Sequence, residues 1–273
     1  MSSVTLRLTE KDVPDGSVIA IFNDLHIPHH DERAMQLAIE CCESIGVTHV
    51  LANGDILDCG PASRHEGKRK RAALDEGCLK ESVAAGLWIL DWFRTRPCVF
   101  TLGNHEDWVT QYIAASPELK GMSTESLLGV WEDGDGWRVL PNKSRVRIGN
   151  LNAEHGDGMF KGGGGMNPGS RMKQLAPDQT TMVGHLHRQF AHYWSSPDAY
   201  GIMRTRAAYG IGHMSMPSAH EEYAGTYTNW QQGFAIVRVY HIDGKARFTP
   251  TLIEIHRDKR NRPIFELEGK VYH

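Results

Sequence analysis

The sequence predicts an α/β protein with a parallel sheet, because apolar runs typical of buried strands alternate with helical patterns. The clearest runs are Val18–Phe22, Val47–Ala52 and Cys98–Leu102, each followed by Asn or Gly. Helical patterns over 31–45 and 72–93 lie between these runs, and apolar residues recur on one face of the second pattern. Strand–helix–strand connections of this kind place the strands parallel to one another.

Further strands are predicted over shorter or later stretches of the chain. They cover 145–153, 180–183, 201–209, 233–240 and 246–255. A turn at Asp243-Gly244 should join the last two into a hairpin. Because the sequence motifs are interleaved along the chain, we expect a single domain over 1–273, with an N-terminal extension over 1–16 and a charged C-terminal tail over 256–273.

Five short clusters of Asp, Asn and His, each placed just after an apolar run, are the most informative feature of the chain. They are Asp24-Leu25-His26, Gly54-Asp55-Ile56-Leu57-Asp58, Gly103-Asn104-His105-Glu106, His155-Gly156-Asp157 and Gly184-His185-Leu186-His187. In an open α/β sheet, ligands bind beyond the carboxyl ends of the strands. All five clusters fall at such ends, so we expect them to converge on one site.

The chemistry of these side chains points to two divalent metals. Carboxylate, amide oxygen and imidazole suit Mn²⁺, Fe, Zn²⁺ and Ni²⁺, whereas the paired thiolates of a structural zinc module are missing. Two dications about 3.5–4 Å apart need an anionic bridge, which Asp55 can provide. In an extended segment, the i, i+2 pairs Asp24/His26 and His185/His187 would each point to one face. Such a site indicates hydrolysis of a phosphoester.

With these five blocks, the chain resembles the calcineurin-like metallophosphoesterase superfamily, and its phage and bacterial members in particular. The resemblance runs from Val18 to His187, with the blocks in family order, and rests most on Gly103–Glu106 and Gly184–His187. It implies a four-layer αββα sandwich, in which two mixed β-sheets lie face to face with helices outside.

The resemblance also implies roles for individual residues. The ligands would be Asp24, His26 and His187 for one metal, Asn104, His155 and His185 for the other, and Asp55 as the bridge. His105 would stabilise the transition state or protonate the leaving oxygen, and Asp58 would orient its neighbours by hydrogen bonding. The expected cofactors are two Mn²⁺ ions, with Fe, Zn²⁺, Ni²⁺ and Mg²⁺ as alternatives.

Departures from subfamily patterns narrow the expected substrate. Asp58 is followed by Cys59, not by the Arg of serine/threonine protein phosphatases, and it occupies the place of the Tyr ligand of purple acid phosphatases. We therefore expect a phosphodiesterase that acts on nucleic acid or nucleotides through a metal-bridging hydroxide. A phosphomonoesterase for a small molecule is the alternative, and a metal-binding scaffold without catalysis is a third.

Three segments are candidates for contact with substrate. Arg64, His65 and the basic residues up to Arg71 can be read as a phosphate clamp or as a solvated loop. The glycine-rich stretch 161–169 can be a lid over the metals or a plain connector, since Gly tolerates almost any backbone conformation. Arg171, just beyond it, can reach substrate or start a surface helix.

Composition sets the outer limits of the interpretation. The chain has 273 residues, of which 40% are hydrophobic and 23% charged, which is ordinary for a globular enzyme. Its formal net charge of −3 excludes a generally basic protein that coats nucleic acid. Five scattered cysteines, and no apolar leader or run long enough to span a membrane, indicate a cytoplasmic protein without a membrane partner.

Some further residues are expected to be structural. His213 and His220 read as loop or packing residues, and Trp88 and Trp92 as core residues. Asn229–Gln232 can close the cleft or form an oligomer interface, and the sequence does not decide between these two roles.

Overall fold

The computed structural model describes residues 3–63, 83–124, 126, 137–160, 164–216 and 228–273. Several features of the sequence lie outside the described residues: Arg64, His65, the basic segment up to Arg71, the first half of the helical pattern over 72–93, residues 161–163 of the glycine-rich stretch, and His220. Within the described residues, no helix has both the length and the apolar character needed to cross a membrane.

The first sheet has six strands in the order β12-β11-β2-β3-β4-β5, and β2 to β5 run parallel. Its strands are β2 (Val18–Phe22), β3 (His49–Asn53), β4 (Cys98–Thr101), β5 (Trp137–Leu140), β11 (Gly233–Ile242) and β12 (Lys245–Glu254). β11 and β12 pair antiparallel, and β11 pairs antiparallel with β2, so the sheet is mixed. The predicted parallel strands and the turn at Asp243-Gly244 are confirmed.

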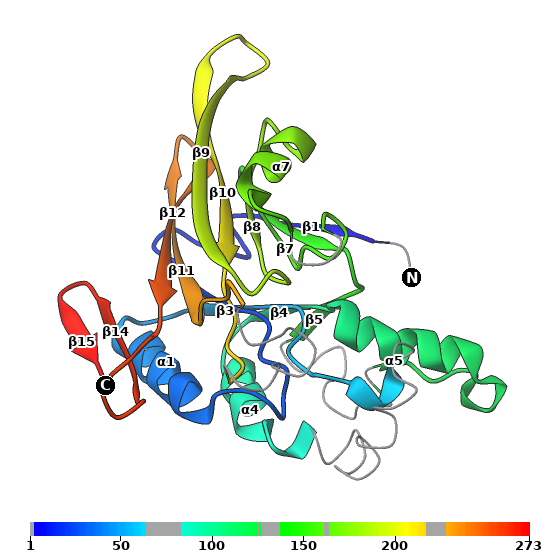
Figure 1. Cartoon of the computed structure of the whole chain (residues 1–273). Coiled ribbons are helices and arrows are strands. Elements are labelled where there is room, and N and C mark those ends of the chain that lie inside the picture. The colour runs from blue at the N-terminus through cyan, green and yellow to red at the C-terminus, as the bar shows by residue number, and fades with distance from the viewer. Residues whose placement is uncertain (1–2, 64–82, 125, 127–136, 161–163, 217–227) are drawn as a thin grey trace.

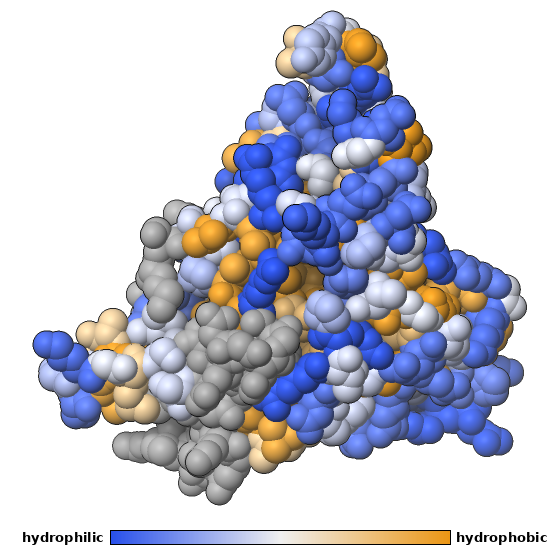
Figure 2. All heavy atoms as spheres, turned by 180° about the vertical axis from the view of Figure 1, so that it is seen from behind, coloured by the Kyte–Doolittle hydropathy of each residue, from blue (hydrophilic) through white to orange (hydrophobic). Residues whose placement is uncertain are grey.

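The second sheet is also mixed and has the order β1-β6-β7-β8-β10-β9. Its strands are β1 (Thr5–Leu8), β6 (Arg145–Ile148), β7 (Leu151–Glu154), β8 (Thr180–Val183), β9 (Gln189–Pro197) and β10 (Met203–Ile211). The β9–β10 hairpin projects from the rest of the molecule (Figure 1). Figure 2 shows apolar atoms at its tip, where Ile202 and Met203 are exposed.

Helices cover the outer faces of the two sheets. They are α1 (Glu32–Ser44), α4 (Leu87–Arg94), α5 (Asn104–Ala115) and α7 (Pro168–Leu175), with 3-10 turns η1 (Gly60–Ala62) and η2 (Pro117–Leu119). Alternation along β2 places Ile19 and Ile21 in the apolar core between the sheets, and Ala20 and Phe22 in the core beneath α1 and α4. A third cluster joins Met172 of α7 to the second sheet. The predicted four-layer αββα sandwich is confirmed.

Both ends of the chain are more ordered than the sequence suggested. The segment expected to be an N-terminal extension contributes β1, which pairs parallel with β6. The segment expected to be a charged tail forms a small sheet of β13 (His256–Arg257), β14 (Pro263–Leu267) and β15 (Lys270–Tyr272). Phe265, Leu267 and Tyr272 join the core near α1, and burying their apolar surface offsets the cost of ordering this segment.

Two predicted elements are interrupted. The helical pattern that ends at 93 is broken by a turn at 85–86, and α4 begins only at Leu87. Leu87 is exposed, although the pattern placed it on the apolar face of the helix. A Cβ at Gly86 would collide with Ile27, so a larger residue here would force the Ile27 side chain to move. The strand predicted over 145–153 is an antiparallel hairpin of β6 and β7, because the chain reverses at Gly149, where φ is +56°.

One buried carboxylate connects three distant parts of the chain. Asp31 caps α1 by accepting a hydrogen bond from the Ala34 amide at 3.0 Å. It also accepts hydrogen bonds from Gln232 at 3.2 Å and from Arg257. Burial raises the pKa of Asp31, but the bond from Arg257 and the other donors lower it below its usual value. The stabilisation is therefore present at neutral pH and is lost as the pH falls through the lowered pKa.

We expect Asp31→Ala to reduce the free energy of unfolding by about 2–3 kcal/mol, because it removes a helix cap and leaves Arg257 without its carboxylate. Urea denaturation followed by circular dichroism measures the loss. The matched control is Asp91→Ala on α4, whose side chain is 65% exposed beside Arg94, and it should stay within about 0.5 kcal/mol of wild type. Equal losses in both variants would contradict a special role for Asp31.

Candidate metal centre

The structure brings the five polar clusters together at the carboxyl ends of strands from both sheets. Asp24 follows β2, Asp55 follows β3 and Asn104 begins α5 just after β4. His155 follows β7, and the pair His185 and His187 follows β8. Three clusters therefore come from the first sheet and two from the second, and the site lies where the two sheets meet.

The backbone that carries these residues is not extended, contrary to the expectation for the i, i+2 pairs. The φ angles are positive at Asp24 (53°), His26 (51°), Asp55 (50°), His185 (61°) and His187 (55°). Left-handed conformations are costly for non-glycine residues and persist where the surrounding structure enforces them. His185 and His187 point to different groups of side chains.

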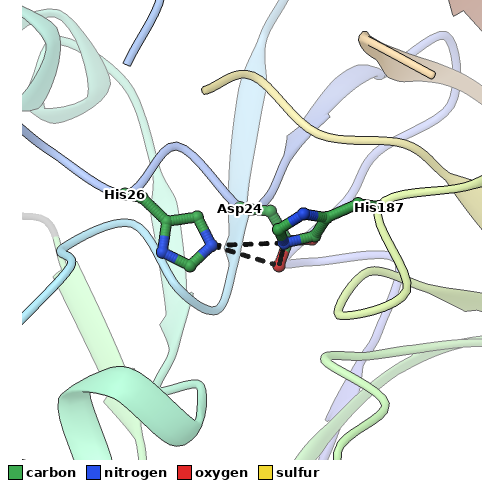
Figure 3. Close-up of side chains that lie close together, drawn as sticks. All are labelled: Asp24, His26 and His187. Carbon is green, nitrogen blue, oxygen red and sulfur yellow. Dashed lines mark hydrogen bonds and ion pairs between the residues drawn. The ribbon is translucent and has the colours of Figure 1, made fainter. Parts of the chain in front are cut away.

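Asp24, His26 and His187 form the first group, and all three are buried (Figure 3). The His187 Nε2 atom lies 3.2 Å from Asp24 Oδ1 and 3.2 Å from His26 Nε2. His26 Nε2 is 3.9 Å from the same carboxylate oxygen. Three ligand atoms thus face one point. The other oxygen of Asp24 accepts hydrogen bonds from the His185 amide and the Asn23 side chain, which hold the carboxylate in place.

Asp55, His155 and His185 form the second group. His155 Nε2 lies 3.1 Å from Asp55 Oδ2 and 3.2 Å from the amide oxygen of Asn104, which brings Asn104 to the same place. The other ring nitrogen of His155 donates to the Asn53 carbonyl at 3.0 Å, which leaves Nε2 to face the group.

A third set, His26, Asp55 and His105, connects the two groups. His105 Nε2 lies 3.9 Å from Asp55 Oδ2, and the His105 ring meets the His26 ring edge-on, with centroids 4.4 Å apart. His105 Nδ1 donates to the Asp58 carbonyl at 2.6 Å. The ligand-type side chains are therefore one continuous array, with Asp55 in its middle.

Asp58 and Glu106 support this array from outside. Asp58 Oδ1 lies 3.3 Å from His26 Nδ1 and 3.4 Å from His105 Nδ1. Glu106 is fully buried and accepts from the amides of Asp55, Leu57 and Gly103. The sequence suggested no role for Glu106, because its acceptor contacts reach residues about fifty positions away.

The close approach of these loops requires glycine at two positions. A Cβ on Gly54 would collide with the imidazole of His155, and a Cβ on Gly103 would collide with the carboxylate of Asp55. Each glycine thus makes room for a side chain that another cluster contributes. This explains why Gly precedes the polar residues in these two clusters.

Opposite charges shift the pKa values of the array strongly. Burial raises the pKa of Asp55, but the imidazoles of His155 and His105 lower it well below its ordinary value. Burial lowers the pKa of the two imidazoles, but the Asp55 carboxylate and its neighbours raise it to about 10 for His155 and about 9 for His105. For His185, burial and the nearby His155 lower the pKa to about 4. Carboxylates and positive charge therefore stabilise each other here.

The residues present fit two divalent cations. The buried Oδ1 of Asp24 accepts no hydrogen bond from the described residues, although two imidazole nitrogens face it. Two Nε2 atoms only 3.2 Å apart, as in His26 and His187, repel each other unless a proton or a metal lies between them. Imidazole, carboxylate and amide oxygen are ligands for divalent transition metals, and the array offers enough of them for a dinuclear site.

Two tryptophans and a histidine lie beside the array. Trp108 and His213 were not anticipated there, whereas Trp230 belongs to Asn229–Gln232, for which closing the cleft was one of two predicted roles. Trp108 packs against His105 with centroids 4.0 Å apart, and Trp230 meets His187 edge-on at 4.4 Å. The buried His213 stacks on His187 at 5.1 Å and lies 2.8 Å from Ser215 Oγ. The three-residue spacing of His105 and Trp108 on a helix could have revealed the first contact.

The structure does not bring every candidate residue into the array. Arg171 is exposed on α7, and its Nε donates to the Met159 carbonyl at 3.1 Å. Arg64 and His65 lie outside the described residues, so their contact with substrate stays a prediction. Trp88 and Trp92 pack against the core beneath the first sheet, as predicted.

Comparison with known structures yields remote relatives. Vps29 from Chaetomium thermophilum is 12% identical, with 94% of this chain and 96% of that chain covered and a TM-score of 0.43. The phosphoesterase YfcE from E. coli is 10% identical, with 86% and 98% covered and a TM-score of 0.39. A dimetal phosphatase from Danio rerio is 9% identical, with 83% and 94% covered and a TM-score of 0.39.

No curated protein matches the chain in sequence. The family model of the calcineurin-like phosphoesterases matches residues 17–198, which is more than half of the chain and includes all five clusters. From this match, and from the array of ligand-type side chains at the strand ends, we conclude that the protein belongs to the calcineurin-like phosphoesterase family.

Proposed function

We propose that this protein is a two-metal phosphodiesterase that acts on nucleic acid or nucleotides. The observation that carries the proposal is the continuous array of ligand-type side chains, with one carboxylate shared at its centre. The proposed ligands are Asp24, His26 and His187 for one cation, Asn104, His155 and His185 for the other, and Asp55 between them.

Two divalent cations at this site would supply a nucleophilic water at neutral pH and offset the charge that grows on the phosphoryl oxygens. The protein's own groups would orient the metal ligands and donate a proton to the leaving oxygen. Asp58 and the Asn53 carbonyl orient the rings of His26 and His155. Because Nδ1 of His105 is engaged by the Asp58 carbonyl, its Nε2 is the atom that would donate a proton to the leaving oxygen.

Trp108 and Trp230 support a substrate that carries nucleobases. Each ring is partly exposed, and the two rings adjoin His105 and His187 at different parts of the array. Aromatic rings beside a phosphate site are typical stacking surfaces for unpaired bases. A diester would place its phosphate over the array and a base on either side, whereas a small phosphomonoester would leave at least one ring unused.

Asp55→Asn tests the proposed site. We expect metal-dependent hydrolysis of bis-p-nitrophenyl phosphate to fall at least about a hundredfold, because the shared carboxylate is lost. Metal content measured on the same samples should fall from two ions per chain, and chelation should abolish the wild-type activity. Asp198→Asn on the projecting hairpin is the control and should keep full activity. Faster hydrolysis of p-nitrophenyl phosphate than of the diester would favour the phosphomonoesterase instead.

His105→Asn tests proton donation. Loss of a donor should slow esters with poor leaving groups, such as a ribose alkoxide, by at least about tenfold more than esters of p-nitrophenol, which needs no proton. Rates on both substrate types, measured at saturating Mn²⁺, give this ratio. His256→Asn, on an exposed strand, is the control. If both substrates lose the same factor, His105 acts by a means other than protonating the leaving group.

Trp230→Leu tests base stacking. The KM for a dinucleotide should rise roughly fivefold to a hundredfold, since stacking contributes about 1–3 kcal/mol per base. The KM for methyl p-nitrophenyl phosphate, which carries no base, should change by less than twofold. Trp230→Phe keeps an aromatic face and should retain most of the affinity for the dinucleotide. A parallel rise in both KM values for Trp230→Leu would instead indicate a general disturbance of His187.

A further inference from the structure

A second site, remote from the metal centre, lies between the two sheets. A cavity of about 280 Å³ lies there between side chains of both sheets and is partly open to solvent. Apolar residues dominate its walls, among them Ile19, Leu51, Val99, Leu151 and Val237. Concave sites that are lined mainly by apolar side chains and carry a few polar groups are typical binding sites for small ligands.

The mouth of the cavity lies at the opposite end of the first sheet from the metal centre. Its lining includes His49 and Cys98, the first residues of β3 and β4, and Arg138 near the start of β5. The proposed metal ligands follow the last residues of these parallel strands. From its mouth the cavity runs between the sheets as far as Ile21 and Ala153, but its lining contains none of the proposed metal ligands, so the two sites are separate.

Charged side chains mark where the cavity opens to solvent. Lys11 and Arg138 are exposed and line the cavity together with one acidic residue, Asp12. Arg138 pairs with Asp12 at 3.0 Å, and His49 Nε2 donates to the Asp12 carbonyl at 2.9 Å. Burial lowers the pKa of His49, so its ring is neutral at neutral pH. Lys11 forms no ion pair or hydrogen bond with the described residues, and the mouth thus carries one positive charge in excess.

We propose that this cavity binds a medium-chain carboxylate, with the hydrocarbon chain between the sheets and the carboxylate beside Lys11. Water is a poor occupant because apolar walls offer it too few polar partners, and apolar cavities of about 150 Å³ are known to stay dry and bind benzene. A volume of about 280 Å³ accommodates a longer chain than that. The uncompensated lysine at the mouth selects an anionic end group over a neutral one.

Isothermal titration of the full-length protein with straight-chain carboxylates, from butyrate to decanoate, tests the size of the cavity. Each added methylene should tighten binding about three- to fourfold, because it buries one more CH₂ group. The gain should stop once the chain fills the cavity. Affinity that is flat from the shortest chain upward, or no binding by any member of the series, would overturn the proposal.

Octanol compared with octanoate tests the charge. Octanol should bind wild type roughly two- to fivefold more weakly, as expected for an exposed charge pair, and should bind Lys11→Met as well as octanoate does. Lys245→Met, on the exposed strand β12, is the matched control and should leave the preference unchanged. Equal preference for octanoate in wild type and Lys11→Met would contradict the role of Lys11.

Ala153→Leu tests the location, because Ala153 lines the cavity from β7. Filling the void should weaken octanoate binding at least about tenfold without destabilising the protein. A measurement on wild type gives the location even if this variant fails to fold: octanoate should shift the methyl NMR signals of Ile19 and Ile21 and leave those of Ile56 and Ile89 unchanged. Shifts confined to Ile56, beside the metal centre, would overturn the assignment.

Discussion

The mutual attraction of buried carboxylates and imidazoles at the junction of the two sheets is the interaction on which the rest of this structure depends. Asp24 and Asp55 are almost fully buried, and their charge is tolerable only because cationic partners surround them. Among the imidazoles, His155 and His105 have raised pKa values and can carry this positive charge. Divalent cations would balance the carboxylate charge more completely, because the carboxylate oxygens and imidazole nitrogens lie close enough together to bind one ion jointly.

This arrangement imposes demands on the backbone and on its neighbours. Left-handed conformations at five of the ligand-type residues aim the side chains inward, and hydrogen bonds to Glu106 hold the loops after β3 and β4 together. Glycine at 54 and 103 leaves room for side chains from other loops. Two rigid sheets provide the framework that makes such strained loops sustainable, because each loop begins at the end of a paired strand.

The same strands contribute residues to two different kinds of site, one polar and one apolar. The carboxyl ends of β2, β3 and β4 carry polar, charged residues, whereas an apolar cavity between the sheets opens near the amino ends of β3 and β4, with a lysine at its mouth.

The sequence by itself determined three of the four parallel strands (β2, β3 and β4, but not β5), the helix after the first of them and the five clusters. These features are local: hydrophobic periodicity and strand-end residues express them within a few positions. Only the tertiary structure decided contacts between distant segments. Trp230 reaches His187, Arg257 reaches Asp31, and Glu106 reaches the amides of Asp55 and Leu57, because sheet pairing returns the chain to these points. Such contacts depend on how the sheets stack, and no local pattern of residues encodes that stacking.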